Sequence, residues 1–268
     1  MPQVLFEKRN HVALVTLNRP EARNAFSPEM LVRLGGVWEE VRDDDQIRVA
    51  IVTGAGDKAF CAGADLGKLI PLISGGRQPE DEWDRKALEA PDLIGNGLLR
   101  TFDAGKPVIA AINGHAIAGG MELAQGTDLR IGVESAKLGV QEVKWAIFPG
   151  GGSTVRLPKQ LPYARAMELL LTGDLITAAE AYDLGFLNRV VPDGQAVDAA
   201  MELAEKIAAN GPIAVQAIRK SARECQGRTE EEAMKMESRF AAPVFRTEDA
   251  REGPRAFMEK RKPVYKGR

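Results

Sequence analysis

The chain has 268 residues, of which 44% are hydrophobic and 28% are charged, and its formal net charge is −2. This length allows one large domain with a substantial core, or one domain with an appendage. The near-neutral charge balance disfavours a nucleic-acid partner, because such partners select basic surfaces. The two cysteines, Cys61 and Cys225, form no CxxC pair and favour a reducing cytosol over a disulfide framework.

The N-terminal segment does not resemble a secretory signal. Residues 7–9 are charged and precede the first apolar run, and no small-residue cleavage site follows. No uncharged apolar stretch approaches the roughly 18 residues that a membrane helix needs. We therefore expect a cytoplasmic protein with no membrane partner.

Short β-branched runs alternate with helical patterns in the first half of the chain. The runs that predict strands are 12–17, 49–54, 108–112 and 128–133. Ser27 followed by Pro28 predicts the start of a helix that continues to about Arg42. Residues 71–82 combine proline, glycine and charge, which is typical of a mobile loop. Strands separated by helices indicate an α/β fold with buried strands.

From residue 197 the sequence pattern becomes helical. Thr229 with Glu232 predicts a capping box, and helical spacing continues to Lys260. We predict a core over residues 1–196 and a C-terminal helical region over residues 197–268. Three or four helices in this region are expected to pack on the core or on a neighbouring subunit.

Signatures of several other enzyme classes fail on inspection. "GADLGKL" lacks the spacing of a phosphate-binding loop, and "GAGDKA" lacks the last glycine of a dinucleotide fingerprint. "GGSTV" around Ser153 lacks the second glycine of a nucleophile elbow. With only His11 and His115, a histidine-rich metal site is not expected. We interpret Cys61 as a small buried side chain and His115 as structural.

Three segments that follow predicted strands join small residues to an acidic residue. They are "AFCAGADL" (59–66), "NGHAIAGGMEL" (113–123) and "LGVQEVKWAIFPGGG" (138–152). Ligands bind beyond the carboxyl ends of strands in α/β sheets, so these segments could converge on one site.

Gly119 and Gly120 are the unusual feature of the second segment. We predict that they open a short helix running to about Gly126, so that their amides lack carbonyl partners in the helix. The positive end of that helix would favour an oxyanion. One amide from the turn at residues 62–65 would supply the second donor of an oxyanion hole.

The acidic residues support two interpretations. Glu122 and Glu142 near an anion hole would suit general acid–base chemistry on a carbonyl compound, with one protonated and the other ionised. Alternatively, Asp65 and Glu122 stabilise helix N-termini, the glycines form turns, and Glu142 is a solvated loop residue. The residues alone leave both interpretations open.

At these residues the sequence resembles the crotonase (enoyl-CoA hydratase/isomerase) superfamily. The matching segments, in order, are "LNRPEARNAFS", "GDKAFCAGADL", "KPVIAAINGHAIAGGMELA", "LGVQEVKWAIFPGGGSTVRLP", "LLLTGDLITAAEAYDLGFLNRVV" and "FRTEDAREGPRAFMEKRKP", and they cover nearly the whole chain. The resemblance implies a spiral of repeated ββα units followed by a helical trimerisation region. It also implies a homotrimer or a dimer of trimers.

The resemblance implies an acyl-CoA thioester as the substrate and no cofactor, since coenzyme A enters as part of that substrate. The oxyanion-hole amides fall on Ala64 and Gly119. The implied contacts with substrate and coenzyme A are Ala22, Arg23, Ala62, Ala64, Asp65, Leu66 and Gly119, with the 62–66 backbone at the adenine end. Hydratases of the family carry glutamates at both acid positions. Their presence implies that Glu122 activates water for attack at C3 and Glu142 delivers a proton to C2.

Other activities share this fold. A Δ3-Δ2 enoyl-CoA isomerase, an acyl-CoA hydrolase, another lyase or a non-catalytic acyl-CoA-binding subunit remain alternatives to the hydratase. Two positions also depart from the family pattern. Val140 stands where well-studied hydratases carry a glutamine that orients the first glutamate. Gly67 stands where a lysine is common, with Lys68 one position later.

Overall fold

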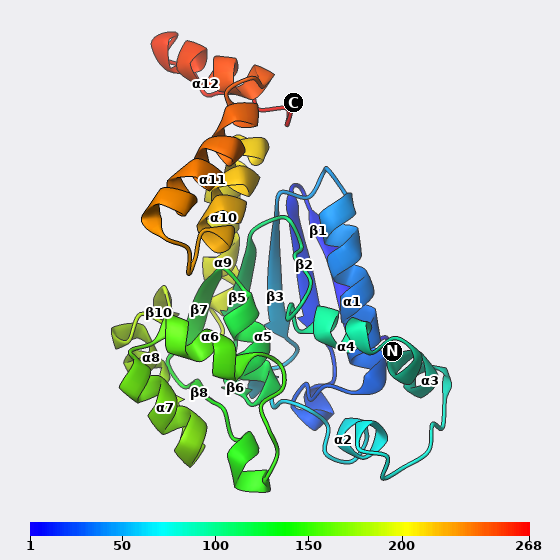
Figure 1. Cartoon of the computed structure of the whole chain (residues 1–268). Coiled ribbons are helices and arrows are strands. Elements are labelled where there is room, and N and C mark those ends of the chain that lie inside the picture. The colour runs from blue at the N-terminus through cyan, green and yellow to red at the C-terminus, as the bar shows by residue number, and fades with distance from the viewer.

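The strands form two sheets (Figure 1). The computed structural model describes residues 1–268, except for the side chains of residues 91, 93 and 94. The six-stranded sheet contains, in spatial order, β1 (Val4–Arg9), β2 (Val12–Leu17), β3 (Val49–Gly54), β5 (Val108–Ile112), β7 (Leu129–Val133) and β10 (Arg189–Val191). The four-stranded sheet contains β4 (Ala59–Cys61), β6 (His115–Ile117), β8 (Lys137–Gly139) and β9 (Ile176–Thr177).

The two strands of each successive pair lie in different sheets. β3, β5 and β7 lie parallel in the larger sheet, and the strands that follow them, β4, β6 and β8, lie parallel in the smaller one. Each pair therefore turns the chain through both layers, which produces the spiral implied by the family resemblance. Because β4, β6 and β8 are parallel, the segments that leave them emerge at the same edge of the smaller sheet.

Helices surround this framework. They are η1 (Pro20–Ala22), α1 (Pro28–Asp43), α2 (Leu69–Ile73), α3 (Glu82–Glu89), α4 (Pro91–Gly97), α5 (Gly119–Gly126), η2 (Glu142–Trp145), α6 (Ser153–Gln160), α7 (Tyr163–Thr172), α8 (Ala178–Asp183), α9 (Ala196–Ala208), α10 (Pro212–Glu224), α11 (Glu230–Val244) and α12 (Glu248–Met258). The predicted caps are confirmed: the Ser27 hydroxyl accepts from the Met30 amide, and Thr229 and Glu232 form a capping box. The helix predicted to begin at Gly119 is also confirmed.

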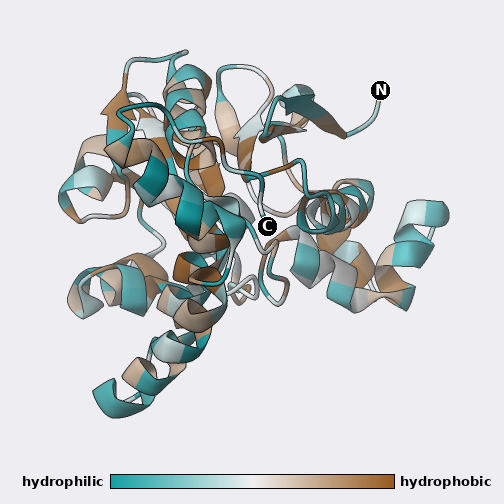
Figure 2. Cartoon of the chain, turned by 90° about the horizontal axis from the view of Figure 1, so that it is seen from above, coloured by the Kyte–Doolittle hydropathy of each residue, from teal (hydrophilic) through white to brown (hydrophobic). Residues whose placement is uncertain are grey.

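The C-terminal helices take two different positions. α9 packs on the larger sheet, and its buried alanines at 200, 204 and 208 allow a close approach. α10, α11 and α12 extend away from the sheets (Figure 1). Most helices of the chain carry both hydrophobic and hydrophilic residues, as expected of amphipathic helices that cover a core (Figure 2). No helix among the described residues is long and apolar enough to span a membrane.

The prediction of a loop over residues 71–82 is wrong at both ends. α2 occupies residues 69–73, and α3 begins at Glu82. Leu69 and Leu72 are buried, so α2 is held by apolar packing that a count of proline, glycine and charge does not reveal. The Asp81 side chain accepts from two amides of the first turn of α3, which fixes where that helix begins.

Gly120 is required by the contact between α5 and β4. A Cβ at this position would lie 2.8 Å from the Cys61 Cβ and closer still to the Cys61 carbonyl oxygen. We expect Gly120→Ala to lower the free energy of unfolding by about 1–3 kcal/mol, measured by urea denaturation. Gly36 is a matched control, because it lies on the exposed face of α1 with no atom within 4 Å of its Cβ position. Gly36→Ala should stabilise by about 0.5–1 kcal/mol, and equal effects of the two substitutions would contradict the close packing.

Candidate active site

A cavity of about 320 Å³ lies where the segments that follow β4, β6 and β8 meet. Four predicted site residues line it: Ala64, Gly119, Glu122 and Glu142. The remaining walls are mainly apolar and include Phe26, Leu31, Leu69, Ile70, Leu98 and Phe148. The structure therefore brings together the three segments that the sequence indicated, in a cavity that suits an apolar ligand with few polar groups.

The amides of Ala64 and Gly119 are both available to a ligand. The Phe26 amide donates to the Gly63 carbonyl at 2.7 Å, and the Asp65 amide donates to the Phe26 carbonyl at 2.9 Å. This parallel pairing turns the intervening Ala64 amide away from Phe26. Gly119 is the first residue of α5, so its amide has no carbonyl in that helix. Within the described chain, neither amide donates to a backbone carbonyl.

A strained residue sets the direction of α5. Ala118 has φ 53° and ψ −124°, a conformation that favours glycine, and its amide donates to the Gly139 carbonyl at 2.8 Å. Gly63, with φ 93°, has no room for a side chain, because a Cβ there would lie 2.6 Å from the Ala118 Cβ. The backbone segments that carry the two free amides therefore touch one another.

Glu122 is buried and is held by the start of α6. The residue is 4% exposed, and Oε1 accepts from the Ser153 amide at 3.2 Å. Burial raises the pKa of Glu122, while the amides of residues 151–153 and the Ser153 hydroxyl oppose that rise. The helix N-terminus thus compensates part of the desolvation of the charged form.

Glu142 has a different environment. It begins η2, and among the described residues its buried Oε2 has no hydrogen-bond partner. Burial and the nearby Glu122 charge raise the pKa of Glu142 to about 7. One carboxyl group is therefore held by amides and the other retains a proton up to neutral pH, a division suited to acid–base work.

The other predicted contacts lie outside the lining of the cavity. Asp65 binds the Arg19 guanidinium at 3.0 Å, and its Oδ1 accepts from the amides of Gly67 and Lys68 just before α2. The helix-stabilising interpretation therefore fits the Asp65 side chain. The Ala62 amide donates to the Arg23 carbonyl at 3.1 Å. Ala22 ends η1, and Leu66 is exposed.

Two residues rejected as catalytic have clear structural environments. The Cys61 thiol is buried, which raises its pKa to about 12 and keeps it protonated. His115 Nδ1 accepts from the Lys137 amide at 3.2 Å and so joins β6 to β8.

Sequence reasoning missed two supports of the site. Asn24 is buried and bonds to the carbonyls of Ala55 and Ala59, which fixes the 19–25 segment against β4. The Ser153 amide binds Glu122, a role that the "GGSTV" pattern does not indicate. Among glutamines near the acids, Gln141 donates to the Gly173 carbonyl at 3.3 Å, and Gln125 donates to the Ser153 hydroxyl at 2.9 Å.

The alternating two-sheet spiral and the amide-lined cavity define a crotonase-type fold. The family model described as enoyl-CoA hydratase/isomerase matches residues 7–268, so the chain belongs to this family.

Several known proteins are similar to this chain over nearly its whole length. Enoyl-CoA hydratase EchA19 of Mycobacterium tuberculosis is 48% identical over 267 residues, covering 100% of this chain and 97% of the relative. (E)-Benzylidenesuccinyl-CoA hydratase of Thauera aromatica is 41% identical over 265 residues, covering 98% and 99%. The crystal structure of an enoyl-CoA hydratase from Mycobacterium tuberculosis H37Rv superposes with a TM-score of 0.89 at 38% identity, covering 100% of both chains. The resemblance and the expected fold are confirmed.

The raised pKa of Glu142 predicts a pH-dependent stability. The ordinary value is 4.5 and the folded value is about 7, so the stability linked to this group is full below pH 4.5 and is lost as the pH rises through about 7. Glu142→Gln removes the ionisation. We expect its stability relative to the parent to grow by about 1–3 kcal/mol between about pH 5 and about pH 9, measured by denaturation at several pH values.

The exposed Glu202 provides the control. Glu202→Gln should show a stability difference from the parent that changes little over the same pH range. A difference for Glu142→Gln that is equally independent of pH would contradict the proposed environment of Glu142.

Proposed function

We propose that the protein is an enoyl-CoA hydratase that converts trans-2-enoyl-CoA to 3-hydroxyacyl-CoA. The observation that carries this proposal is the pair Glu122 and Glu142, whose environments differ and which face one cavity together with two free amides. Hydration needs a base for water, an acid for carbon and donors for the thioester oxygen, and these groups can supply all three.

In the proposed reaction, the thioester oxygen accepts hydrogen bonds from the amides of Ala64 and Gly119. Ionised Glu122 takes a proton from water as the water oxygen bonds to C3, and the C2–C3 π electrons move into an enolate. Neutral Glu142 then gives its proton to C2. The two carboxyl groups exchange their protonation states in the forward reaction, and proton exchange with solvent restores them.

The proposed reaction requires no metal or redox cofactor, because the polarised thioester activates the double bond. Coenzyme A enters with the substrate, and we propose that its contacts extend from Ala64 over the neighbouring backbone of Ala62, Asp65 and Leu66, with Ala22 and Arg23 close by. Support for this path comes from the bond between Ala62 and Arg23, which places the two segments side by side.

We also propose a homotrimer or a dimer of trimers in the cytoplasm. Ile218, Met234 and Phe245 are exposed on or next to α10 and α11, and apolar surface of this kind favours association. The cytoplasmic location rests on the two unpaired cysteines.

The direct test is hydration of crotonyl-CoA, followed by the loss of enoyl-thioester absorbance. We expect Glu142→Gln to lower kcat by about 10²–10⁴-fold, because the proton donor is removed. For the parent, kcat/KM should fall as the pH rises through about 7, where Glu142 of the free enzyme loses its proton. Binding of butanoyl-CoA is the control and should be largely retained.

Mass spectrometry of the product separates the rival activities. Isomerisation adds no water and hydrolysis releases coenzyme A. Failure of the parent protein to hydrate short, medium and branched enoyl-CoAs would reject the proposal, and binding without turnover would favour a non-catalytic subunit.

Gly151 provides a second test, through Glu122. A Cβ at Gly151 would lie 2.7 Å from the Glu122 Cδ, so Gly151→Ala must displace the carboxylate. We expect kcat for hydration to fall by about 100-fold, because small displacements of catalytic groups are costly. Gly150→Ala is the matched control, since its nearest neighbour would be 3.9 Å away, and it should cause a much smaller loss. Equal losses would contradict this role of Gly151.

A further inference from the structure

A second hollow adjoins the cavity that holds the two glutamates. It has a volume of about 270 Å³ and lies between the 148–156 segment and the residues that follow α4. Arg100, Thr101, Phe148 and Gly150 line both spaces. Arg100 thus lines the cavity that holds the two glutamates, within reach of the far end of an acyl group whose thioester lies at the amides.

The hollow is electropositive. Its lining residues include Arg100, Arg156, Thr101 and Thr154, and among the described residues they include no aspartate or glutamate. Asp92 lines only the larger cavity, and in the described part of the chain no ion pair joins it to Arg100. A negative group would complement this lining.

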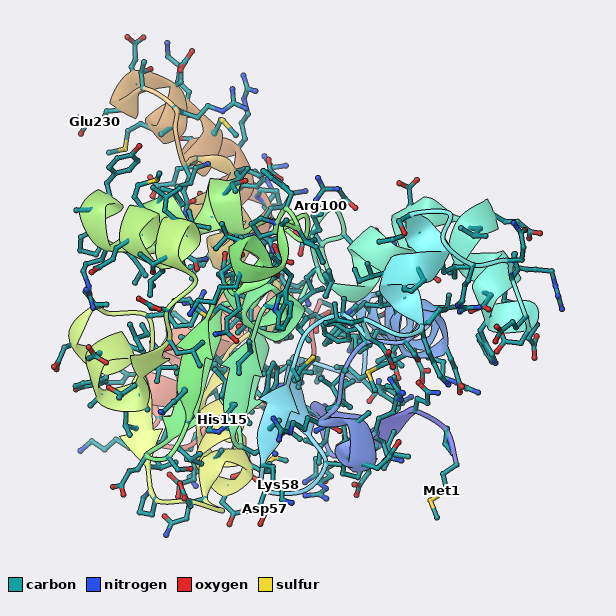
Figure 3. The ribbon with its side chains drawn as sticks, turned by 90° about the horizontal axis from the view of Figure 1, so that it is seen from below. Met1, Asp57, Lys58, Arg100, His115 and Glu230 are labelled. Atoms are coloured by element: carbon teal, nitrogen blue, oxygen red, sulfur yellow. The ribbon has the colours of Figure 1, made fainter. Side chains whose placement is uncertain are left out.

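Arg100 has a fixed backbone and an uncommitted side chain. Its amide donates to the Gly95 carbonyl at 2.8 Å, and its carbonyl accepts from the Arg156 guanidinium at 3.3 Å. Its exposed guanidinium makes no hydrogen bond or ion pair with the described side chains. Figure 3 places Arg100 between the part of the chain that holds α5 and α6 and the helices α2 to α4.

Arg156 adds positive charge behind this position. It donates to the carbonyl of Leu99, but its buried Nη1 has no acceptor among the described residues. Burial lowers the pKa of Arg156, and the charges of Arg223 and Arg100 lower it further, against the opposing effect of Glu122. Arg156 and Arg100 therefore lie close enough to repel one another, and a bound anion would relieve that repulsion.

We propose that this hollow binds a carboxylate at the far end of the acyl group and that Arg100 determines this specificity. The substrate class is then the CoA monothioesters of unsaturated dicarboxylic acids. This inference rests on the proposed hydration, which places the thioester at Ala64 and Gly119. Leu98 and Phe148 line the cavity and provide apolar surface for the methylene groups between the two ends. A guanidinium suits this task because it binds a carboxylate through two parallel hydrogen bonds.

The test compares trans-2-hexenoyl-CoA with the CoA monothioester of trans-hex-2-enedioic acid, which differ in the terminal group. The parent should hydrate the dicarboxylic substrate with the higher kcat/KM. Arg100→Gln should lower the ratio of the two kcat/KM values by about 10- to 100-fold, the effect expected for a lost charge-assisted bond. Arg100→Lys should retain part of the preference, and Arg251→Gln, at an exposed position on α12, should retain all of it.

The possible failures are distinguishable. An unchanged ratio in Arg100→Gln would overturn the inference and leave the proposed hydration intact. Arg100→Gln could instead weaken the binding of both substrates and of free coenzyme A equally, without weakening the binding of 3′-dephospho-CoA. That result would show that Arg100 binds a phosphate and would also overturn the inference. If the parent hydrates neither these two compounds nor any of the short, medium and branched enoyl-CoAs, the proposed function fails. Calorimetry with adipoyl-CoA and hexanoyl-CoA still tests the subsite, because equal affinities would overturn it without any turnover.

Discussion

The buried Glu122 carboxylate is the constraint on which the site depends. A carboxylate with 4% exposure is stable only if the fold supplies donors, and here the start of α6 supplies them. This requirement fixes α5, which carries Glu122, against α6, which carries Ser153. The Gln125 bond to the Ser153 hydroxyl ties the two helices a second time. The same hydrogen bonds therefore determine both the position of the Glu122 carboxylate and the packing of α5 against α6.

The glycines around the site serve different purposes, although they look alike in the sequence. Gly120 lacks a side chain because β4 lies against it, and Gly151 lacks one because the Glu122 carboxylate occupies that space. Gly63 must also adopt a positive φ and avoid Ala118. Gly119 is less restricted by space, since its Cβ position is 3.3 Å from the Phe26 ring, and its value to a ligand lies in its free amide.

The sequence predicted the larger sheet better than the smaller one. The runs that became β2, β3, β5 and β7 have five or six residues, long enough for β-branched enrichment to be visible. β4, β6 and β8 have three residues each, too few to show a period, and they lie inside segments described only as following predicted strands. Only the family resemblance indicated that these segments contain strands.

The features of the candidate site that involve neighbouring residues were predicted from the sequence, and those that join distant residues were not. Local spacing predicted that Gly119 opens a helix and that Glu122 follows one turn later, because both facts concern consecutive residues. That Ser153 holds Glu122 joins residues 31 positions apart, and neither side chain signals the other. The Asp65 side chain shows the reverse, since its bonds to Gly67 and Lys68 are local and its helix-stabilising role was visible in the sequence.

Local strain and desolvation concentrate at the same few residues. Ala118 adopts a conformation that costs a non-glycine residue about 1–3 kcal/mol, and Glu142 buries an oxygen for which the described residues offer no partner. Each of these features would be removed by a simple substitution that improves stability. In the proposed function both features serve the ligand: the turn at Ala118 directs the Gly119 amide, and the desolvation of Glu142 favours its protonated form. Such penalties persist where the surrounding packing is strong enough to hold them, and here that packing is the contact of β4, α5 and α6.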